Sequence, residues 1–160
     1  MLAISEKKHR LSLDLYKGLV SVDYTACTRN RATFFTKPLQ VERAARVLVD
    51  KAAKWTCDVV IFQFMPDHVH IILKGAREDS DTYRVMKMFK QKTGFLFSQA
   101  GFGIVWQKDF YDHILRTESE LSSHLRYILD NPVLKGLVGM WQKYPYRGST
   151  VFELDQWDVG

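Results

Sequence analysis

Residues 19–28 (LVSVDYTACT) alternate between apolar and polar side chains, which is the pattern of a strand with one buried face. From Pro38 the apolar residues instead recur at helical spacing as far as Trp55, and a proline is tolerated in the first helical turn. The apolar side chains of this second pattern are Val41, Ala44, Ala45, Leu48, Val49 and Ala52. A strand followed by a helix is therefore predicted for the first third of the chain.

The centre of the chain predicts a hairpin. Residues 58–64 (DVVIFQF) are mostly β-branched or aromatic, as in a strand that is buried on both faces. Met65, Pro66 and Asp67 then form a turn, because proline and aspartate favour turns, and residues 68–74 form the returning strand.

The second half of the chain predicts a helix, a strand and a further helix. A basic helical pattern runs from Tyr83 to residue 97 or 98, and a strand bent at residues 108–109 is expected over 104–115. Thr117 and Glu120 have the spacing of a capping box, so a third helix begins there. We expect this helix to end at Pro132.

The resulting order of elements is strand, helix, strand, strand, helix, strand, helix. It predicts an α+β fold of the ferredoxin-like split βαβ type, with a mostly antiparallel sheet, helices on one face and an added C-terminal helix. A chain of 160 residues can bury one core. We therefore expect a single domain over residues 1–160, with its core at about 16–140 and an irregular tail at 141–160.

Composition narrows the class of protein. No apolar run approaches the roughly 20 residues needed to cross a bilayer, and the N-terminal residues lack an apolar signal core. The expectation is a cytoplasmic protein without a membrane partner. Cys27 and Cys57 lie far apart and are expected to be reduced, packed thiols.

The formal charge of +5 and the isoelectric point of about 9.2 favour a polyanionic partner. Basic side chains on the second helix are candidates for DNA phosphate contacts, and an aromatic segment of the tail is a candidate for stacking on unpaired bases. A solvated helix face is the alternative for the basic residues. These DNA-binding candidates are Arg84, Lys87, Lys90, Lys92, Trp141, Tyr144 and Arg147.

Two histidines occur one residue apart at the start of the strand over 68–74. Residues two apart on a strand project from the same face, so His68 and His70 can bind one metal ion while Val69 points into the core. The alternative is structural, with one histidine packed in the core and the other at the surface.

Tyr127 and Asn131 are four residues apart on the third predicted helix and therefore lie on the same face. This spacing allows a tyrosine nucleophile and an amide ligand to face one point. Read without the histidines, Tyr127 is interpreted as a core aromatic and Asn131 as a helix end before Pro132.

Taken together, five short segments of the chain resemble a known family. They are FMPDHVH at 64–70, WQ at 106–107 with YDHILR at 111–116, and YILDNPV at 127–133 with KGLV at 135–138. Their order and combination are similar to those of single-tyrosine transposases of the HUH endonuclease superfamily, in particular the transposases associated with repetitive extragenic palindromes (REP). In the wider superfamily the position of Asn131 is often occupied by glutamine, which has a longer reach.

The resemblance implies a role for each site residue. His68, His70 and Asn131 are expected to bind a divalent metal, Mg²⁺ or Mn²⁺, and Tyr127 is expected to be the nucleophile. The resemblance also implies a substrate: single-stranded DNA folded into REP-type hairpins, nicked and rejoined through a 5′-phosphotyrosine. Such an enzyme would be nucleoid-associated when bound to DNA, and we expect a monomer, with a homodimer as the alternative.

Two other functions are compatible with the same residues. In a metal-dependent phosphoesterase, His68 and His70 would activate water, and no covalent intermediate would form. In a non-catalytic DNA-binding protein, the same residues would bind DNA without chemistry.

Overall fold

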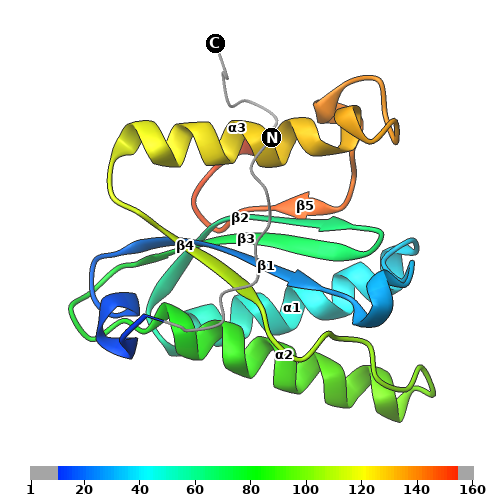
Figure 1. The fold of residues 1–160 in the computed structure, drawn as a ribbon, viewed down its shortest axis with the longest axis horizontal. Coiled ribbons are helices and arrows are strands. Elements are labelled where there is room, and N and C mark those ends of the chain that lie inside the picture. The colour runs from blue at the N-terminus through cyan, green and yellow to red at the C-terminus, as the bar shows by residue number, and fades with distance from the viewer. Residues whose placement is uncertain (1–10, 155–160) are drawn as a thin grey trace.

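The computed structural model, shown in Figure 1, describes residues 11–154. In this range, five strands form one antiparallel sheet in the order β4-β1-β3-β2-β5. The strands are β1 (Ser21–Cys27), β2 (Cys57–Met65), β3 (His68–Gly75), β4 (Tyr111–Leu115) and β5 (Arg147–Gly148). The helices are α1 (Pro38–Lys54), α2 (Thr82–Gln99) and α3 (Glu118–Leu134), with short 3-10 turns at Leu13–Tyr16, Arg29–Arg31 and Trp141–Lys143.

The sheet is covered differently on its two faces (Figure 1). Helices α1 and α2 lie together on one face, and α3 crosses the other. The large apolar core lies between the sheet and α1 and α2, and it contains Val69, Ile71 and Leu73 from β3. A smaller apolar cluster lies under α3, where Ile72 joins Leu125, Ile128 and Leu129. The predicted α+β fold with an added C-terminal helix is confirmed.

A β-bulge adjusts the face of β2. The pairing of β2 with β3 shifts between Val59 and Ile61, so Val60 is the extra residue. Because of this shift, Val59 belongs to the large core whereas Val60 and Ile61 belong to the cluster under α3. The bulge thereby gives α3 an additional apolar contact on the sheet.

The expected strand over 104–115 is shorter than predicted, because β4 contains only Tyr111–Leu115. The preceding residues form a loop that bridges the sheet only where Trp106 pairs with Thr28. Lys90 explains this difference: its ammonium group donates to the carbonyl oxygens of residues 107, 108 and 109 at 2.7–3.1 Å. These carbonyls are therefore turned toward α2 and away from a neighbouring strand.

Helix α3 does not end at Pro132, as predicted, but continues to Leu134. A proline inside a helix leaves the carbonyl oxygen four residues earlier without its usual donor, here that of Ile128. The side-chain amide of Gln63 on β2 donates to the Ile128 carbonyl oxygen and satisfies it. The sheet thus supplies the hydrogen bond that Pro132 removes, so the helix continues past the proline.

The tail is more ordered than expected. Residues 141–143 form a 3-10 turn, β5 pairs with the outer edge of β2, and the Tyr144 hydroxyl donates to the Phe64 carbonyl oxygen. The final part of the predicted tail, residues 155–160, lies outside the described residues.

Two expectations from composition can be compared with the structure. Within residues 11–154, no helix is both long and apolar enough to cross a membrane. Cys27 and Cys57 are buried free thiols, as their separation predicted.

The bond between Gln63 and α3 gives a stability prediction. Replacing Gln63 by leucine leaves the buried Ile128 carbonyl oxygen without a donor, which should lower the free energy of unfolding by about 1–3 kcal/mol. In a Pro132→Ala background, residue 132 regains an N–H that can donate to the same oxygen. We expect the cost of Gln63→Leu to fall below about 1 kcal/mol there, as measured by urea unfolding of all four proteins. Equal costs in both backgrounds would contradict this account.

Candidate active site

The register of the sheet sets the direction of both histidines. His68 lies opposite Cys27 and Met65, and His70 lies opposite Thr25 and Gln63. Residues paired in this way share a face of the sheet. Since Val69, Ile71 and Leu73 fill the core under α1 and α2, the two histidines face α3.

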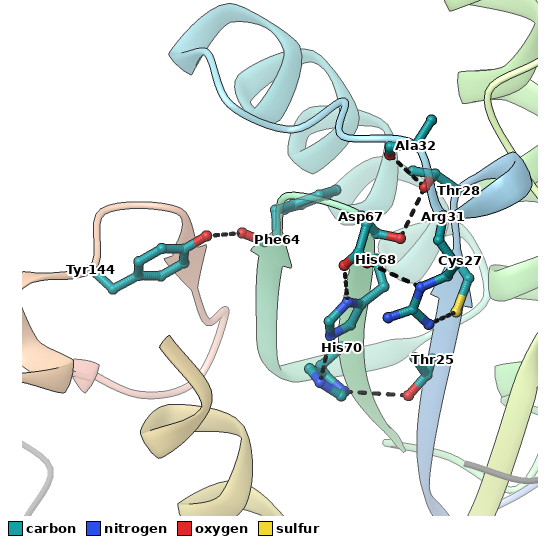
Figure 2. A network of polar contacts seen from close by, with 10 residues as sticks. All are labelled: Thr25, Cys27, Thr28, Arg31, Ala32, Phe64, Asp67, His68, His70 and Tyr144. Carbon is teal, nitrogen blue, oxygen red and sulfur yellow. Dashed lines mark hydrogen bonds and ion pairs between the residues drawn. The ribbon is translucent and has the colours of Figure 1, made fainter. Parts of the chain in front are cut away.

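The imidazole rings of His68 and His70 converge on one point (Figure 2). Their Nε2 atoms are 3.1 Å apart, and the rings are perpendicular, with centroids separated by 4.7 Å. The other nitrogen of each ring has its own partner: Asp67 Oδ1 lies 2.7 Å from Nδ1 of His68, and Thr25 Oγ1 lies 3.2 Å from Nδ1 of His70. If each Nδ1 carries the proton, both Nε2 lone pairs point to the same place.

Burial keeps both imidazoles neutral. His68 and His70 are only 4% and 3% exposed. Burial lowers the pKa of His68, although the hydrogen bond to Asp67 opposes the shift, and it lowers the pKa of His70 well below its ordinary value. A neutral imidazole is the form that binds a metal ion.

The spacing of the Nε2 atoms fits a shared metal ion. Two nitrogens that are each about 2.1 Å from one ion, at an angle of about 95°, are separated by about 3.1 Å. The described residues contain no group of three or more His, Cys, Asp or Glu side chains that could hold a metal. A site here therefore needs a further ligand of another type, such as an amide.

Asn131 has the properties of such a ligand. Its side chain is 3% exposed, and its Oδ1 atom has no hydrogen-bond partner among the described residues. A buried carbonyl oxygen without a donor is unfavourable unless another group satisfies it. An amide oxygen with two neutral imidazoles is a donor set that fits Mg²⁺ or Mn²⁺ when substrate oxygens complete the coordination.

Tyr127 lies beside the histidine pair. Its half-buried ring is 6.1 Å from the ring of His70, centroid to centroid, in an edge-on arrangement. Asn131 follows one turn later on α3. The structure therefore brings His68, His70 and Tyr127 together, and it places the buried Asn131 on the same helix as Tyr127.

A charged chain behind His68 was not found from the sequence. Arg31 donates from Nε to Asp67 Oδ2 at 3.0 Å, and one of its terminal nitrogens contacts Cys27 Sγ at 3.1 Å. Burial acts to raise the pKa of Asp67, but the hydrogen bond from His68 and the charge and hydrogen bond of Arg31 outweigh it and lower that pKa. Asp67 is therefore an anion that holds His68 by its Nδ1 atom.

The turn that carries Arg31 is strained. Asn30 and Arg31 have φ angles of 55° and 54°, in the left-handed region that residues other than glycine rarely adopt. Neither residue stands in a sequence pattern that predicts a site, because the contact with Asp67 joins positions 36 residues apart. Only the pairing of β1 with β3 brings them together.

The predicted DNA-binding residues have different surroundings. Arg84 and Lys87 belong to α2, which lies on the sheet face opposite α3 (Figure 1). Lys90 is bound to loop carbonyls, and Lys92 lies near the Phe95 ring. In the tail, the Arg147 guanidinium packs over the Trp141 ring at 4.8 Å.

Tyr144 is the candidate whose environment fits least with its predicted role. It is 5% exposed, and its hydroxyl donates to the Phe64 carbonyl oxygen. Its ring is therefore packed in the protein and not open to stacking on a base. A basic pocket of about 480 Å³ that the sequence did not suggest lies next to Arg31, with Arg29 and Lys108 in its lining.

A comparison with known families matches most of the chain. The model of the family described as "Transposase IS200 like" matches residues 18–131, which contain both histidines, Tyr127 and Asn131. The chain belongs to this transposase family. Its membership of the family identifies it as a DNA-processing enzyme.

Individual relatives are similar over most of the chain. A Haemophilus influenzae protein assigned as a REP-associated tyrosine transposase is 29% identical over 146 residues, which cover 74% of this chain and 80% of the relative. The REP-associated tyrosine transposase of Escherichia coli is 26% identical over 125 residues, covering 77% and 72% respectively. A solved REP-associated tyrosine transposase bound to a REP hairpin has the same fold, with a TM-score of 0.73, 21% identity and coverage of 97% and 94%.

The buried imidazoles predict a pH dependence of stability. Because the pKa of His70 is lower in the folded state than in the unfolded state, the unfolded chain takes up a proton first as the pH falls below about 6.5. This part of the stability is present above that pH and is lost below it. In metal-free buffer, the midpoint temperature of thermal unfolding should therefore fall less between about pH 7.5 and 5.5 for His70→Asn than for the wild type. If the midpoint temperatures of the two proteins changed in parallel with pH, His70 would not be the source of this loss of stability.

Proposed function

We propose that this protein nicks and rejoins single-stranded DNA hairpins of the REP type through a 5′-phosphotyrosine on Tyr127. The observation that supports this most directly is the position of the Tyr127 ring, 6.1 Å from a buried histidine pair whose Nε2 atoms converge at 3.1 Å. The REP-associated relatives and the hairpin bound by the solved relative support the choice of DNA.

In the proposed reaction, the Tyr127 oxygen attacks the scissile phosphorus. The new bond joins this oxygen to phosphorus, the bond from phosphorus to the 3′-oxygen breaks, and the released 3′-oxygen becomes a hydroxyl as the phenol loses its proton. Rejoining is the reverse reaction with the 3′-hydroxyl of another strand. The phosphotyrosine retains the energy of the phosphodiester, so no nucleotide cofactor is needed.

The side chains around the metal have separate roles in this proposal. His68 and His70 would hold a divalent ion, Mg²⁺ or Mn²⁺, through Nε2, and Asn131 would add its amide oxygen. When bound, the ion would neutralise phosphate oxygens and make the phosphorus more electrophilic. Thr25 and Asp67 would keep the imidazoles in the orientation and tautomer that ligation requires.

We further propose that Arg84, Lys87 and Lys92, together with Trp141 and Arg147, contact the DNA outside the reacting phosphate. Arg29 and Lys108 are additional candidates, because they line a basic pocket that also includes Arg31. Arg31 is bound to Asp67, which is bound to His68, so hydrogen bonds link one lining residue of this pocket to the histidine pair. We propose a monomer that acts as one domain over its 160 residues.

Transfer of labelled DNA to the protein tests this function. Hairpins from the REP-type repeats of the source genome, each with single-stranded flanks, would be labelled at either the 5′ or the 3′ end and incubated with Mn²⁺. On a denaturing protein gel, the wild type should carry only the 3′-end label, because the 5′ phosphate at the nick becomes attached to Tyr127. Tyr127→Phe and addition of a chelator should each abolish the labelled band.

Tyr111→Phe is the matched control, since this half-buried tyrosine lies on β4. It should retain the adduct. An adduct that survives in Tyr127→Phe but not in Tyr111→Phe would contradict the assignment. Cleaved DNA without an adduct would instead indicate the phosphoesterase, and hairpin binding without cleavage would indicate a non-catalytic DNA-binding protein.

Metal binding tests the role of Asp67 without using activity. Removal of a carboxylate that orients a ligating histidine typically weakens metal binding by about 10–100-fold. The comparison is made in a Tyr127→Phe protein with hairpin DNA. Electron paramagnetic resonance of free Mn²⁺ should show weaker Mn²⁺ binding when Asp67→Ala is added to this protein. Asp58→Ala, on the adjacent strand, should bind Mn²⁺ like its parent. Unchanged Mn²⁺ affinity in Asp67→Ala would contradict a role for this residue in metal binding.

A further inference from the structure

A second polar contact joins α3 to the sheet, away from the histidine pair. His124 on α3 has its Nδ1 atom 2.7 Å from Asp23 Oδ2 on β1, and both side chains are largely buried, at 12% and 13% exposure. The residues are 101 positions apart in sequence. This pair is not used by the proposed reaction, so its burial calls for another explanation.

The groups around Asp23 and His124 favour one geometry of this contact. The His113 ring from β4 stacks on His124, with centroids 5.0 Å apart and an interplanar angle of 13°. The hydrogen bond to Asp23 raises the pKa of His124, and Glu120 on α3 and the charge of Asp23 add to this effect. Burial raises the pKa of Asp23 although His124 and His113 oppose it. A buried polar pair of this kind is costly to break from one side.

Gln63 on β2 also makes a polar contact with α3. Its amide donates to the Ile128 carbonyl oxygen that Pro132 leaves without a helical donor. Gln63 lies opposite His70 in the sheet. The two contacts therefore hold α3 three residues before Tyr127 and one residue after it.

Directional contacts matter here because the apolar contact of α3 is small. Among residues 11–154, the cluster under α3 contains eight buried apolar residues, compared with twenty-two in the core under α1 and α2. Apolar contacts favour burial but tolerate small rotations and shifts, whereas a hydrogen bond of 2.7 Å has a narrow range of distance and angle. The position of the helix is thus set more strictly by its polar contacts.

We propose that Asp23 and His124, with Gln63 as a second contact, are positioning residues that hold α3 so that Tyr127 faces the histidine pair. The inference rests on the proposed function, because it assigns a purpose to the position of Tyr127. Displacement of a reacting group by about 1 Å can cost about 10²-fold in rate. The pair would therefore matter more to the rate of phosphotyrosine formation than to folding.

The variants below distinguish an effect on the position of Tyr127 from an effect on the stability of the protein. His124→Leu and Asp23→Leu each leave one polar group buried without its partner, whereas the double variant removes both groups. Replacement of a buried ion pair by apolar side chains often restores stability, but it does not restore a directional contact. His124→Asn is the conservative variant, because an Asn amide nitrogen can donate from the position of histidine Nδ1.

Three quantities would be measured for each variant: thermal unfolding, the rate of adduct formation at saturating hairpin DNA, and hydrogen exchange of the α3 amides without DNA. His124→Leu and the double variant should form the adduct about 10²-fold more slowly. The double variant should recover the midpoint temperature lost in the single variants, and α3 should still exchange faster than in the wild type. His124→Asn should recover most of the rate.

Ser123→Leu is the matched control, because this exposed side chain precedes His124 on α3. It should keep the wild-type rate and the wild-type exchange. A double leucine variant that regains both stability and rate would reduce the pair to a structural role and overturn the proposal. A wild-type protein without an adduct contradicts the proposed function itself, whereas a wild-type adduct with an unchanged rate in His124→Leu contradicts only the positioning role.

Discussion

The antiparallel pairing of β3 between β1 and β2 determines where the site can form. In this register, Val69, Ile71 and Leu73 fill the large core, and the alternate positions face α3. Because strand side chains alternate with a period of two, a shift of one residue would exchange these faces. His68 and His70 would then enter the apolar core, and three apolar side chains would face the tyrosine helix. The core and the histidine site therefore depend on the same register.

The two faces of the sheet serve different purposes. The face under α1 and α2 carries most of the buried apolar residues, while the face under α3 combines a small apolar cluster with polar side chains from three strands: Asp23, Thr25, Gln63, His68 and His70. Buried polar groups need partners with good geometry. Several of these groups have partners on α3 or on neighbouring side chains, whereas Asp23 Oδ1, Gln63 Oε1 and the nearby Asn131 Oδ1 have none among the described residues.

Sequence periodicity was sufficient to predict the fold and to single out some residues of the candidate site. The hairpin and the three α-helices of the described residues follow from local patterns. The histidine pair and Tyr127 were singled out by their combination with other motifs, and the structure places them side by side. The residues that organise the site are not visible locally, because Arg31 reaches Asp67, and Gln63 reaches Ile128, only after the strands and α3 have assembled. The same reason explains two wrong predictions. Lys90 holds residues 107–109 out of the expected strand, and Gln63 allows α3 to continue beyond Pro132.

In the proposed reaction, one tyrosine, Tyr127, becomes covalently linked to DNA beside the histidine pair. Tandem mass spectrometry tests it most directly: the protein is incubated with hairpin DNA, the DNA is trimmed with nuclease, and the peptides are sequenced. The account predicts that residue 127 alone carries a 5′-linked nucleotide among the tyrosines of the chain. A nucleotide on Tyr111, Tyr144 or another side chain, with residue 127 unmodified, would contradict it.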